Sequence, residues 1–184
     1  MKQIIVFVFT LSTVFGHTFA QTDAKSTDTF EQTDKGSHLA GGTINISGTN
    51  SNQTNLFNAN LNPNYGYFIA NNLAIGGILS MSYTSTKNLQ TRSGILSPFI
   101  RYYFGAPKTA MFFAYGSAGG GLRSDNSQKN VGLFNYSVGP GFDYFVNNHV
   151  AFEALATFSG SKYNESGTGF NNSVGLLIGL QVFF

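Results

Sequence analysis

Residues 170–184 read FNNSVGLLIGLQVFF and alternate between two kinds of side chain along their whole length. Bulky apolar residues fill most even positions, including Val174, Ile178 and the terminal Phe184, whereas the odd positions are mostly small or polar. A period of two is typical of a β-strand whose two faces have unlike surroundings. The stretch is also longer than the roughly 5–6 residues usual in soluble proteins. It predicts a long final strand with one apolar face.

Seven upstream segments repeat this alternation, so the sequence predicts eight strands. The segment at 110–122 is rich in glycine and alanine, which leaves either of its faces open as the outer one. Its pattern leans towards an outward direction for Phe112, Ala114, Ala118 and Leu122. Aromatic residues gather on the apolar faces beside the short connections. We expect strands at residues 37–47, 58–69, 73–84, 91–104, 110–122, 131–146, 150–158 and 170–184.

The connections between these segments alternate in length. Short periplasmic turns and longer outer loops are the pattern of transmembrane β-barrels. An even number of strands also brings both termini of the barrel chain to the periplasmic side. Lipid offers no hydrogen-bond partner to an open sheet edge, so a membrane sheet must close. The sequence therefore predicts an all-β fold, an eight-stranded antiparallel up-and-down transmembrane β-barrel. Short connections lie at 70–72, 105–109 and 147–149, and longer ones at 48–57, 85–90, 123–130 and 159–169.

A secreted soluble barrel of the lipocalin type is the alternative, and its apolar face would point inward. Eight strands enclose little volume, so the many Phe, Tyr, Leu and Ile of the apolar faces would not fit inside. The opposite faces are rich in Gly, Ser and Asn, which suits a packed polar lumen. Five large residues on those faces further fill the lumen and predict the absence of a wide pore: Phe68, Phe99, Tyr103, Leu155 and Phe183.

The N-terminal region predicts export. Residues 1–20 place one lysine before a short apolar core and end in small residues, as a cleavable secretory signal peptide does. Residues 21–36 are mostly Thr, Asp, Lys and Ser without an apolar period, and we expect a disordered periplasmic leader there. The barrel then spans residues 37–184.

The chain resembles a known family in three places. These are residues 63–77 (PNYGYFIANNLAIGG), residues 97–104 (SPFIRYYF) and the terminal Phe184. They are similar to small outer-membrane β-barrel proteins of the OmpA/OmpX type, particularly those of Bacteroidetes. The resemblance spans about residues 37–184 and implies the outer membrane of a Gram-negative cell, with outer-membrane lipid and lipopolysaccharide around the barrel. It also implies that Phe184 serves as an assembly signal for the barrel-assembly machinery. It says little about molecular activity.

Composition and motifs argue against metal binding, nucleic-acid binding and catalysis. Cysteine is absent, which excludes disulfides and thiolate metal sites, and the net charge of +2 is too small to predict nucleic-acid binding. His38 and His149 lack metal-ligand spacing and both map to the periplasmic rim, whereas the Ser-rich loops map outside. The glycine run at 116–121 precedes no helix and is no phosphate loop. We expect no catalytic residues, no metal and no cofactor.

Three charged residues fall on the inward faces: Arg101, Asp143 and Glu153. A three-residue turn at 147–149 places Asp143 opposite Glu153, where two carboxylates repel each other. The planar fork of Arg101 can bridge them. We therefore expect a structural charge network that fixes the lumen, without catalysis by the acid pair.

Basic residues collect in or beside the presumed outer loops. They are either a solvated rim or contacts for the phosphates of lipid A, since Lys and Arg suit phosphate oxygens. Exposed charges contribute little, which favours the solvated rim. The residues concerned are Lys87, Arg92, Arg123, Lys129 and Lys162.

These features predict a passive structural or envelope-interaction protein, a monomer and not an enzyme. Two alternatives remain from the sequence. One is a narrow channel for small solutes or ions, and the other is a lipid-modifying outer-membrane enzyme.

Overall fold

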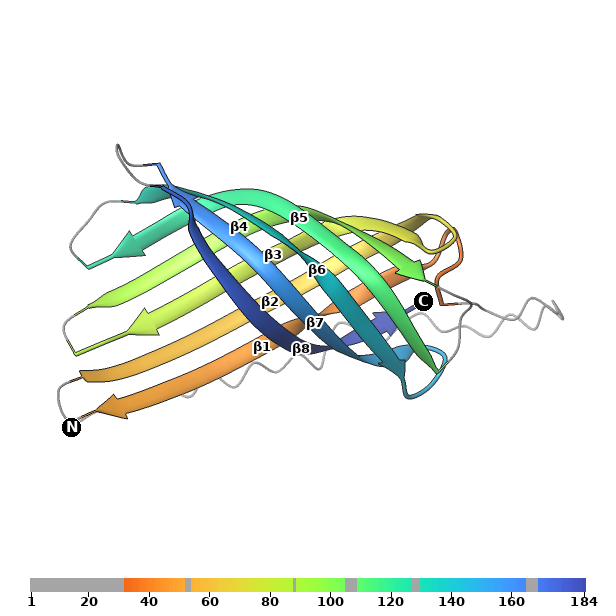
Figure 1. The fold of residues 1–184 in the computed structure, drawn as a ribbon, viewed down its shortest axis with the longest axis horizontal. Helices are drawn as coiled ribbons and strands as arrows, with labels where there is room; N and C mark the ends of the chain where they lie inside the picture. Colours follow the sequence, from red (N-terminus) through yellow and green to blue (C-terminus); the bar gives the residue numbers. More distant parts are fainter. Residues whose placement is uncertain (1–31, 52–53, 88, 105–108, 127–129, 165–168) are drawn as a thin grey trace, which may run out of the picture.

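The computed structural model describes residues 32–51, 54–87, 89–104, 109–126, 130–164 and 169–184. These residues form one closed antiparallel barrel in which each strand pairs with its neighbours in the sequence and β8 returns to β1 (Figure 1). The predicted signal peptide and most of the predicted leader lie outside the described residues. The strands are β1 (His38–Ser51), β2 (Thr54–Ala70), β3 (Leu73–Ser85), β4 (Gln90–Phe104), β5 (Ala110–Asp125), β6 (Val131–Phe145), β7 (Val150–Tyr163) and β8 (Asn171–Phe183).

The two ends of the barrel differ. The end at which β2–β3, β4–β5 and β6–β7 connect is called the turn end here, and the opposite end is the loop end. The start of β1 and the residue after β8 lie side by side at the turn end. The backbone amide of His38 donates to the carbonyl of Phe184 at 2.6 Å, and the backbone amide of Phe184 donates to the carbonyl of His38 at 3.0 Å. This pair of hydrogen bonds joins the first and last strands and closes the barrel.

The outer face is apolar, as the alternation predicted. Phe112 and Leu122 on β5 are exposed by 64% and 56%, while the intervening Phe113 is 1% exposed. The prediction that β5 directs four residues outward is confirmed: Phe112, Ala114, Ala118 and Leu122. The large outward side chains include Ile75, Leu96, Ile100, Tyr102, Phe104, Tyr144, Phe152 and Phe184.

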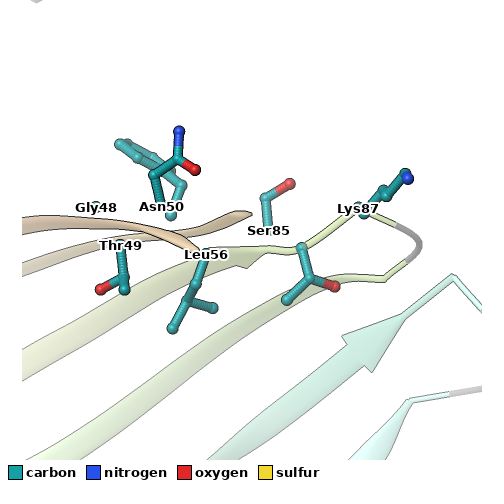
Figure 2. Close-up of a pocket in the computed structure, with 8 residues that line it drawn as sticks. Gly48, Thr49, Asn50, Leu56, Ser85 and Lys87 are labelled. Carbon is teal, nitrogen blue, oxygen red and sulfur yellow. The ribbon is translucent and has the colours of Figure 1, made fainter. Parts of the chain in front are cut away.

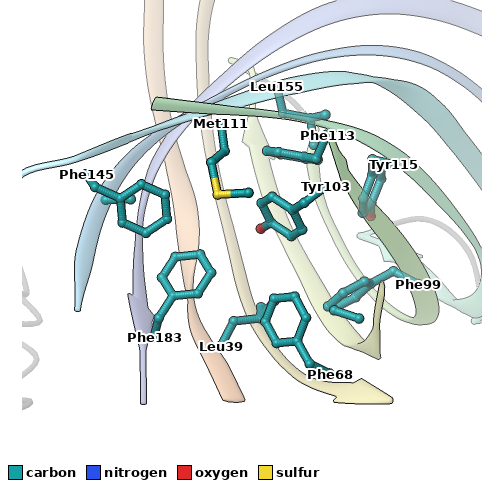
Figure 3. Close-up of a cluster of buried hydrophobic side chains, with 12 residues drawn as sticks. Leu39, Phe68, Phe99, Tyr103, Met111, Phe113, Tyr115, Phe145, Leu155 and Phe183 are labelled. Atoms are coloured by element: carbon teal, nitrogen blue, oxygen red, sulfur yellow. The ribbon is translucent and has the colours of Figure 1, made fainter. Parts of the chain in front are cut away.

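The inner face carries a tight aromatic cluster near the turn end, called the aromatic plug here. Tyr103 lies at its centre, with its ring centroid 5.1 Å from that of Phe113, 5.7 Å from that of Phe68 and 6.3 Å from that of Phe183 (Figure 3). The five residues expected to fill the lumen are all buried, which confirms that expectation. The plug consists of Leu39, Phe68, Ala74, Phe99, Tyr103, Met111, Phe113, Tyr115, Phe145, Ala151, Leu155 and Phe183.

The turn after β2 is tight, and the connection between β1 and β2 is shorter than the sequence predicted. Asn72 ends the turn between β2 and β3 with a φ of 67°, the left-handed conformation that Asn tolerates. Residues 48–57 were expected to form one of the longer connections, and that is wrong: β1 runs to Ser51 and β2 starts at Thr54. The strands continue past the apolar belt because polar residues keep pairing, as Ser47 does with Asn58.

The described part of the predicted leader packs against the barrel. Residues 32–36 form turns against the turn end, where Thr33 is buried and donates its hydroxyl to Asn72 Oδ1 at 2.6 Å. Gly36 has a φ of 99°, which favours glycine, and donates its amide to the carbonyl of Phe68 at 2.9 Å. The polar composition of this segment did not reveal these partners, since they come from β2 and the β2–β3 turn.

Candidate functional site in the lumen

Arg101 of β4 and Glu153 of β7 form an ion pair inside the barrel. Both side chains are 1% exposed, and the two guanidinium nitrogens Nη1 and Nη2 face the two carboxylate oxygens of Glu153. Gln181 of β8 donates its amide to the same carboxylate at 3.0 Å. Strand alternation explains the placement, because odd-numbered residues of β4, β7 and β8 all point inward.

Asp143 of β6 lies directly opposite Glu153, as counting from the turn predicted. It is fully buried and accepts a hydrogen bond from the Tyr103 hydroxyl at 3.0 Å. The expected bridge from Arg101 to both carboxylates therefore takes another form: the guanidinium binds Glu153, and a tyrosine from the same strand holds Asp143. Tyr103 reaches across the lumen to do so, which its position on β4 did not reveal.

Three rings enclose the Arg101 guanidinium. Its central carbon lies 4.8 Å from the ring centroid of Phe113, 5.2 Å from that of Phe99 and 5.5 Å from that of Tyr115. Cation–π contacts of this kind gain strength where water is excluded. The ion pair and the aromatic plug thus form one packed unit. We call Arg101, Tyr103, Asp143, Glu153 and Gln181 the charged cluster.

A polar cavity of about 330 Å³ lies next to the charged cluster and extends towards the loop end. The lumen therefore differs from the uniformly packed polar interior that was expected, since its packed part is aromatic and its polar part is hollow. Arg101, Tyr115 and Glu153 border the cavity at its base. Amide and hydroxyl side chains supply most of its wall: Thr43, Asn45, Asn60, Asn62, Asn64, Ser80, Ser97, Ser117, Asn135, Ser137, Thr157, Ser159 and Ser173.

Some buried polar atoms around the cavity lack a protein partner among the described residues. They are Asn64 Oδ1, Arg101 Nε, Asp143 Oδ1 and Gln181 Oε1. Buried polar groups in native proteins are almost always hydrogen-bonded to protein, water or ligand. Asn64 and Arg101 both line the cavity, so hydrogen-bonding capacity is directed into it. A signal for this is visible in the sequence, namely the asparagines at successive even positions of β2.

A second depression of about 370 Å³ lies at the loop end, on the rim of β1, β2 and β3 (Figure 2). Lys87 stands at its edge, and the side chains of Leu56 and Thr49 point away from that of Asn50. The depression is open to its surroundings, and its wall includes Phe57, which is 43% exposed. It brings together no pair of charged groups.

The basic residues predicted in or beside the outer loops, where described, lie at the loop end but differ in the directions of their side chains. Arg92 is exposed on the outer face with its guanidinium carbon 5.7 Å from the ring centroid of Tyr83, and the exposed Lys162 lies 5.9 Å from that of Phe170. Arg123 instead follows the inward side of β5 and packs 5.0 Å from the ring centroid of Tyr163. Contact of Arg123 with lipopolysaccharide stays a prediction. Lys87 is exposed, and Lys129 lies outside the described residues.

The histidines stand at the turn end. His38 is 2.7 Å from the Tyr65 hydroxyl and stacks on the ring of Phe184, while His149 Nδ1 lies 2.9 Å from the carbonyl oxygen of Phe183. Among the described residues no three His, Cys, Asp or Glu side chains are grouped so that they could hold a metal ion. The described chain also contains no helix long and apolar enough to cross a membrane.

No protein-family model and no curated protein matches the sequence. Solved structures do match. Neisserial surface protein A superposes with a TM-score of 0.58 at 15% identity, over 82% of this chain and 98% of that one. The β-barrel domain of OprF from Pseudomonas aeruginosa matches with a TM-score of 0.47 at 18% identity, over 82% and 98%. Ail from Yersinia pestis matches with 0.49 at 12% identity, over 82% and 99%.

At these identities the likeness concerns the fold, and the first of the three structures is the one similar enough to carry it. It agrees with the closed ring of eight antiparallel strands described above. The chain has the fold of the small eight-stranded outer-membrane β-barrel proteins, which is what the resemblance seen in the sequence implied.

Proposed function

We propose that this protein is an integral barrel of the bacterial outer membrane with a structural or envelope-interaction role. Its turn end, where the first strand begins and the last strand finishes, faces the periplasm, and its loop end faces outward. The observation that carries this proposal is the reversed distribution of side chains: the outer face is apolar all around the barrel, and the ionic groups Arg101, Asp143 and Glu153 are inside. A face of this kind is stable against lipid and costly against water.

The test is folding into detergent, followed by gel electrophoresis of boiled and unboiled samples. A folded membrane barrel keeps its compact form without boiling and migrates differently from the unfolded chain. A protein that instead stays monomeric in water and binds no detergent would contradict the proposal.

The packed turn end supports a passive role over the channel alternative. The aromatic plug and the charged cluster fill the lumen, and Phe68, Tyr103 and Phe183 are fully buried there. Eight-stranded barrels leave room for side chains and little else. We expect no large and steady ion conductance from the purified protein in a planar lipid bilayer. Stable openings in every inserted molecule would favour the channel instead.

The proposed partners are lipid, lipopolysaccharide and the assembly machinery, with the protein as a monomer. Lys87, Arg92 and Lys162 are exposed towards the loop end and suit lipid A phosphates. Reversing all three charges to Glu should weaken binding of the folded protein to lipid A vesicles. Lys35→Glu, one exposed charge reversal at the turn end, is the control for position, and each single reversal at the loop end is compared with it. Equal binding of the loop-end and turn-end variants would leave the basic residues as a solvated rim.

Phe184 directly follows β8 and carries an outward aromatic ring, 45% exposed, which suits the assembly-signal role that the resemblance implies. The lipid-modifying alternative gains no support from the geometry. His38 and His149 stand at the turn end, and the serines of the polar cavity extend away from it.

A further inference from the structure

The first and last strands pair over a short stretch only. The β1–β8 pairing runs from Leu39 opposite Phe183 to Thr43 opposite Gly179. The pairing of β7 with β8, by contrast, extends all the way to Asn171. Beyond Thr43 the two strands diverge towards the loop end, as the orange and dark blue ribbons show (Figure 1). Residues 44–50 and 171–178 thus border an open seam in the wall.

Side chains along this seam are exposed on both faces of the strands. Ile44 and Ile46 are each 65% exposed, and Val174 is 83% exposed. The inward-pointing Asn45 and Ser173 are exposed as well, unlike inward residues deeper in the barrel. The seam therefore has apolar outer lips and polar inner edges.

The polar cavity lies directly behind the seam. Thr43 and Asn45 of β1 and Ser173 and Gly175 of β8 all line it, so both borders of the seam are also walls of the cavity. Its charge balance is simple, because the lining cation Arg101 is paired with the lining anion Glu153. What remains for a ligand is a set of uncharged amides and hydroxyls.

We propose that the seam and cavity bind a single-chain amphiphile with an uncharged, hydroxyl- or amide-bearing head. The head lies in the polar cavity, where it can satisfy Asn64 Oδ1 and Arg101 Nε, and the alkyl chain leaves between Ile46 and Val174 into the bilayer. This occupant matches the apolar lips and polar interior together. A charged head lacks a free counter-charge among the lining residues and would lose its hydration. The site rests on the proposed membrane location.

Membrane physics gives a reason for such an occupant. Unpaired strand edges have no hydrogen-bond partners in hydrocarbon, and each unsatisfied backbone group is costly there. Three outcomes can remove the cost: the strands zip together, a strand of a second copy pairs with the edge, or the hydroxyl or amide groups of a ligand head reach the unpaired edges from the cavity side. The cavity behind the seam favours the ligand, because its wall already carries unpartnered polar atoms.

Photolabelling tests the site. The protein is folded in phosphatidylcholine vesicles with dodecyl glucoside that carries a photoreactive diazirine on the sugar, and labelled residues are mapped by mass spectrometry. Labels should appear on inner-wall residues remote from lipid, such as Ser97 and Asn135. Excess dodecyl glucoside should remove them, and dodecyl sulfate and free glucose should not. Labels confined to outward residues would overturn the proposal.

Two matched glycine variants sharpen this test. A Cβ at Gly175 meets Thr157 Oγ1 at 3.4 Å inside the cavity, and a Cβ at Gly116 meets Ile100 Cγ2 at 3.7 Å on the outer face of β5, so both sites have room. Gly175→Phe should reduce inner-wall labelling about tenfold, which corresponds to about 1.4 kcal/mol of binding free energy. Gly116→Phe should leave it unchanged. Equal labelling of the two variants would contradict the site.

The seam itself is testable because the chain contains no cysteine. If pairing continued in register, Ile46 would face Leu176, and a cysteine pair there would form a disulfide. In the open seam that pair should stay reduced under mild oxidant, while a control pair at Ala40 and Val182, which are partners, should close. A disulfide at 46/176 within one chain means that the strands zip together, and one between chains means that a second copy occupies the edge. Either result overturns the proposal, even if Gly175→Phe fails to fold.

Failure of the membrane proposal would look different. In that case the unboiled protein would show no shifted gel mobility in detergent, and the Ala40/Val182 control would report on a chain outside the membrane. A barrel that shifts its mobility, closes the control disulfide and takes no inner-wall label would reject the amphiphile site alone.

Discussion

Arg101→Ala will lower the free energy of unfolding of the barrel by about 3–5 kcal/mol, because it leaves a buried carboxylate without its cation. Glu153 loses its ion-pair partner and stays opposite Asp143, so two acidic groups remain together in the lumen. The guanidinium also leaves the space among Phe99 and Phe113. Urea unfolding in one detergent, followed by gel mobility or circular dichroism, measures the change.

The matched control is Arg123→Ala. Arg123 also points inward and also packs on an aromatic ring, that of Tyr163, but it is half-buried near the loop end. We expect a clearly smaller loss of stability there. A double variant, Arg101→Met with Glu153→Gln, should recover part of the loss because it removes the carboxylate that Arg101 neutralises and leaves Asp143, held by Tyr103, as the one acidic side chain of the charged cluster. Equal urea midpoints for Arg101→Ala and Arg123→Ala would refute the charged cluster as a stabilising unit.

Phe113→Ala should have a comparable effect, a loss of about 3–5 kcal/mol, since truncation of a packed aromatic side chain leaves a cavity. Phe113 is 1% exposed, and it contacts both the Tyr103 ring and the Arg101 guanidinium. The change therefore affects the aromatic plug and the charged cluster together. Urea midpoints in the same detergent give the measurement.

The adjacent residue provides the control. Phe112 is 64% exposed on the outer face, where its ring centroid lies 5.0 Å from that of Phe142. In Phe112→Ala the space fills with detergent or lipid chains, so we expect less than half the loss seen for Phe113→Ala. A larger loss at Phe112 than at Phe113 would mean that the core lies on the other side of the sheet.

The strand alternation predicted much of this architecture because period-two patterns report directly which side chains share a face. Asp143 was placed opposite Glu153 by counting from a short turn, and Phe68 and Phe183 were placed inside by parity. These are local relations between neighbours. They depend on the strand period and on turn length, both of which can be read from a sequence.

Relations across the lumen could not be predicted in this way. The hydrogen bond from the Tyr103 hydroxyl to Asp143 joins β4 to β6. Whether the two side chains can reach each other depends on the tilt and stagger of the closed sheet. The open seam is also a property of closure, because it concerns where Gly179 stops pairing with β1. The error at residues 48–57 has a different cause: Asn, Ser and Thr are common in loops, yet here they pair across strands.

The central claim is that the apolar face of the sheet points into lipid. Single spin labels on cysteines along β4 test it directly, with outward positions Leu96, Ile100 and Phe104 compared with inward positions Ser93 and Ile95. In phospholipid vesicles, the outward labels should be accessible to oxygen and protected from a water-soluble nickel reagent, and the inward labels should not share that oxygen-rich, nickel-protected pattern. Outward labels reached by the nickel reagent, or no alternation along the strand, would contradict the account.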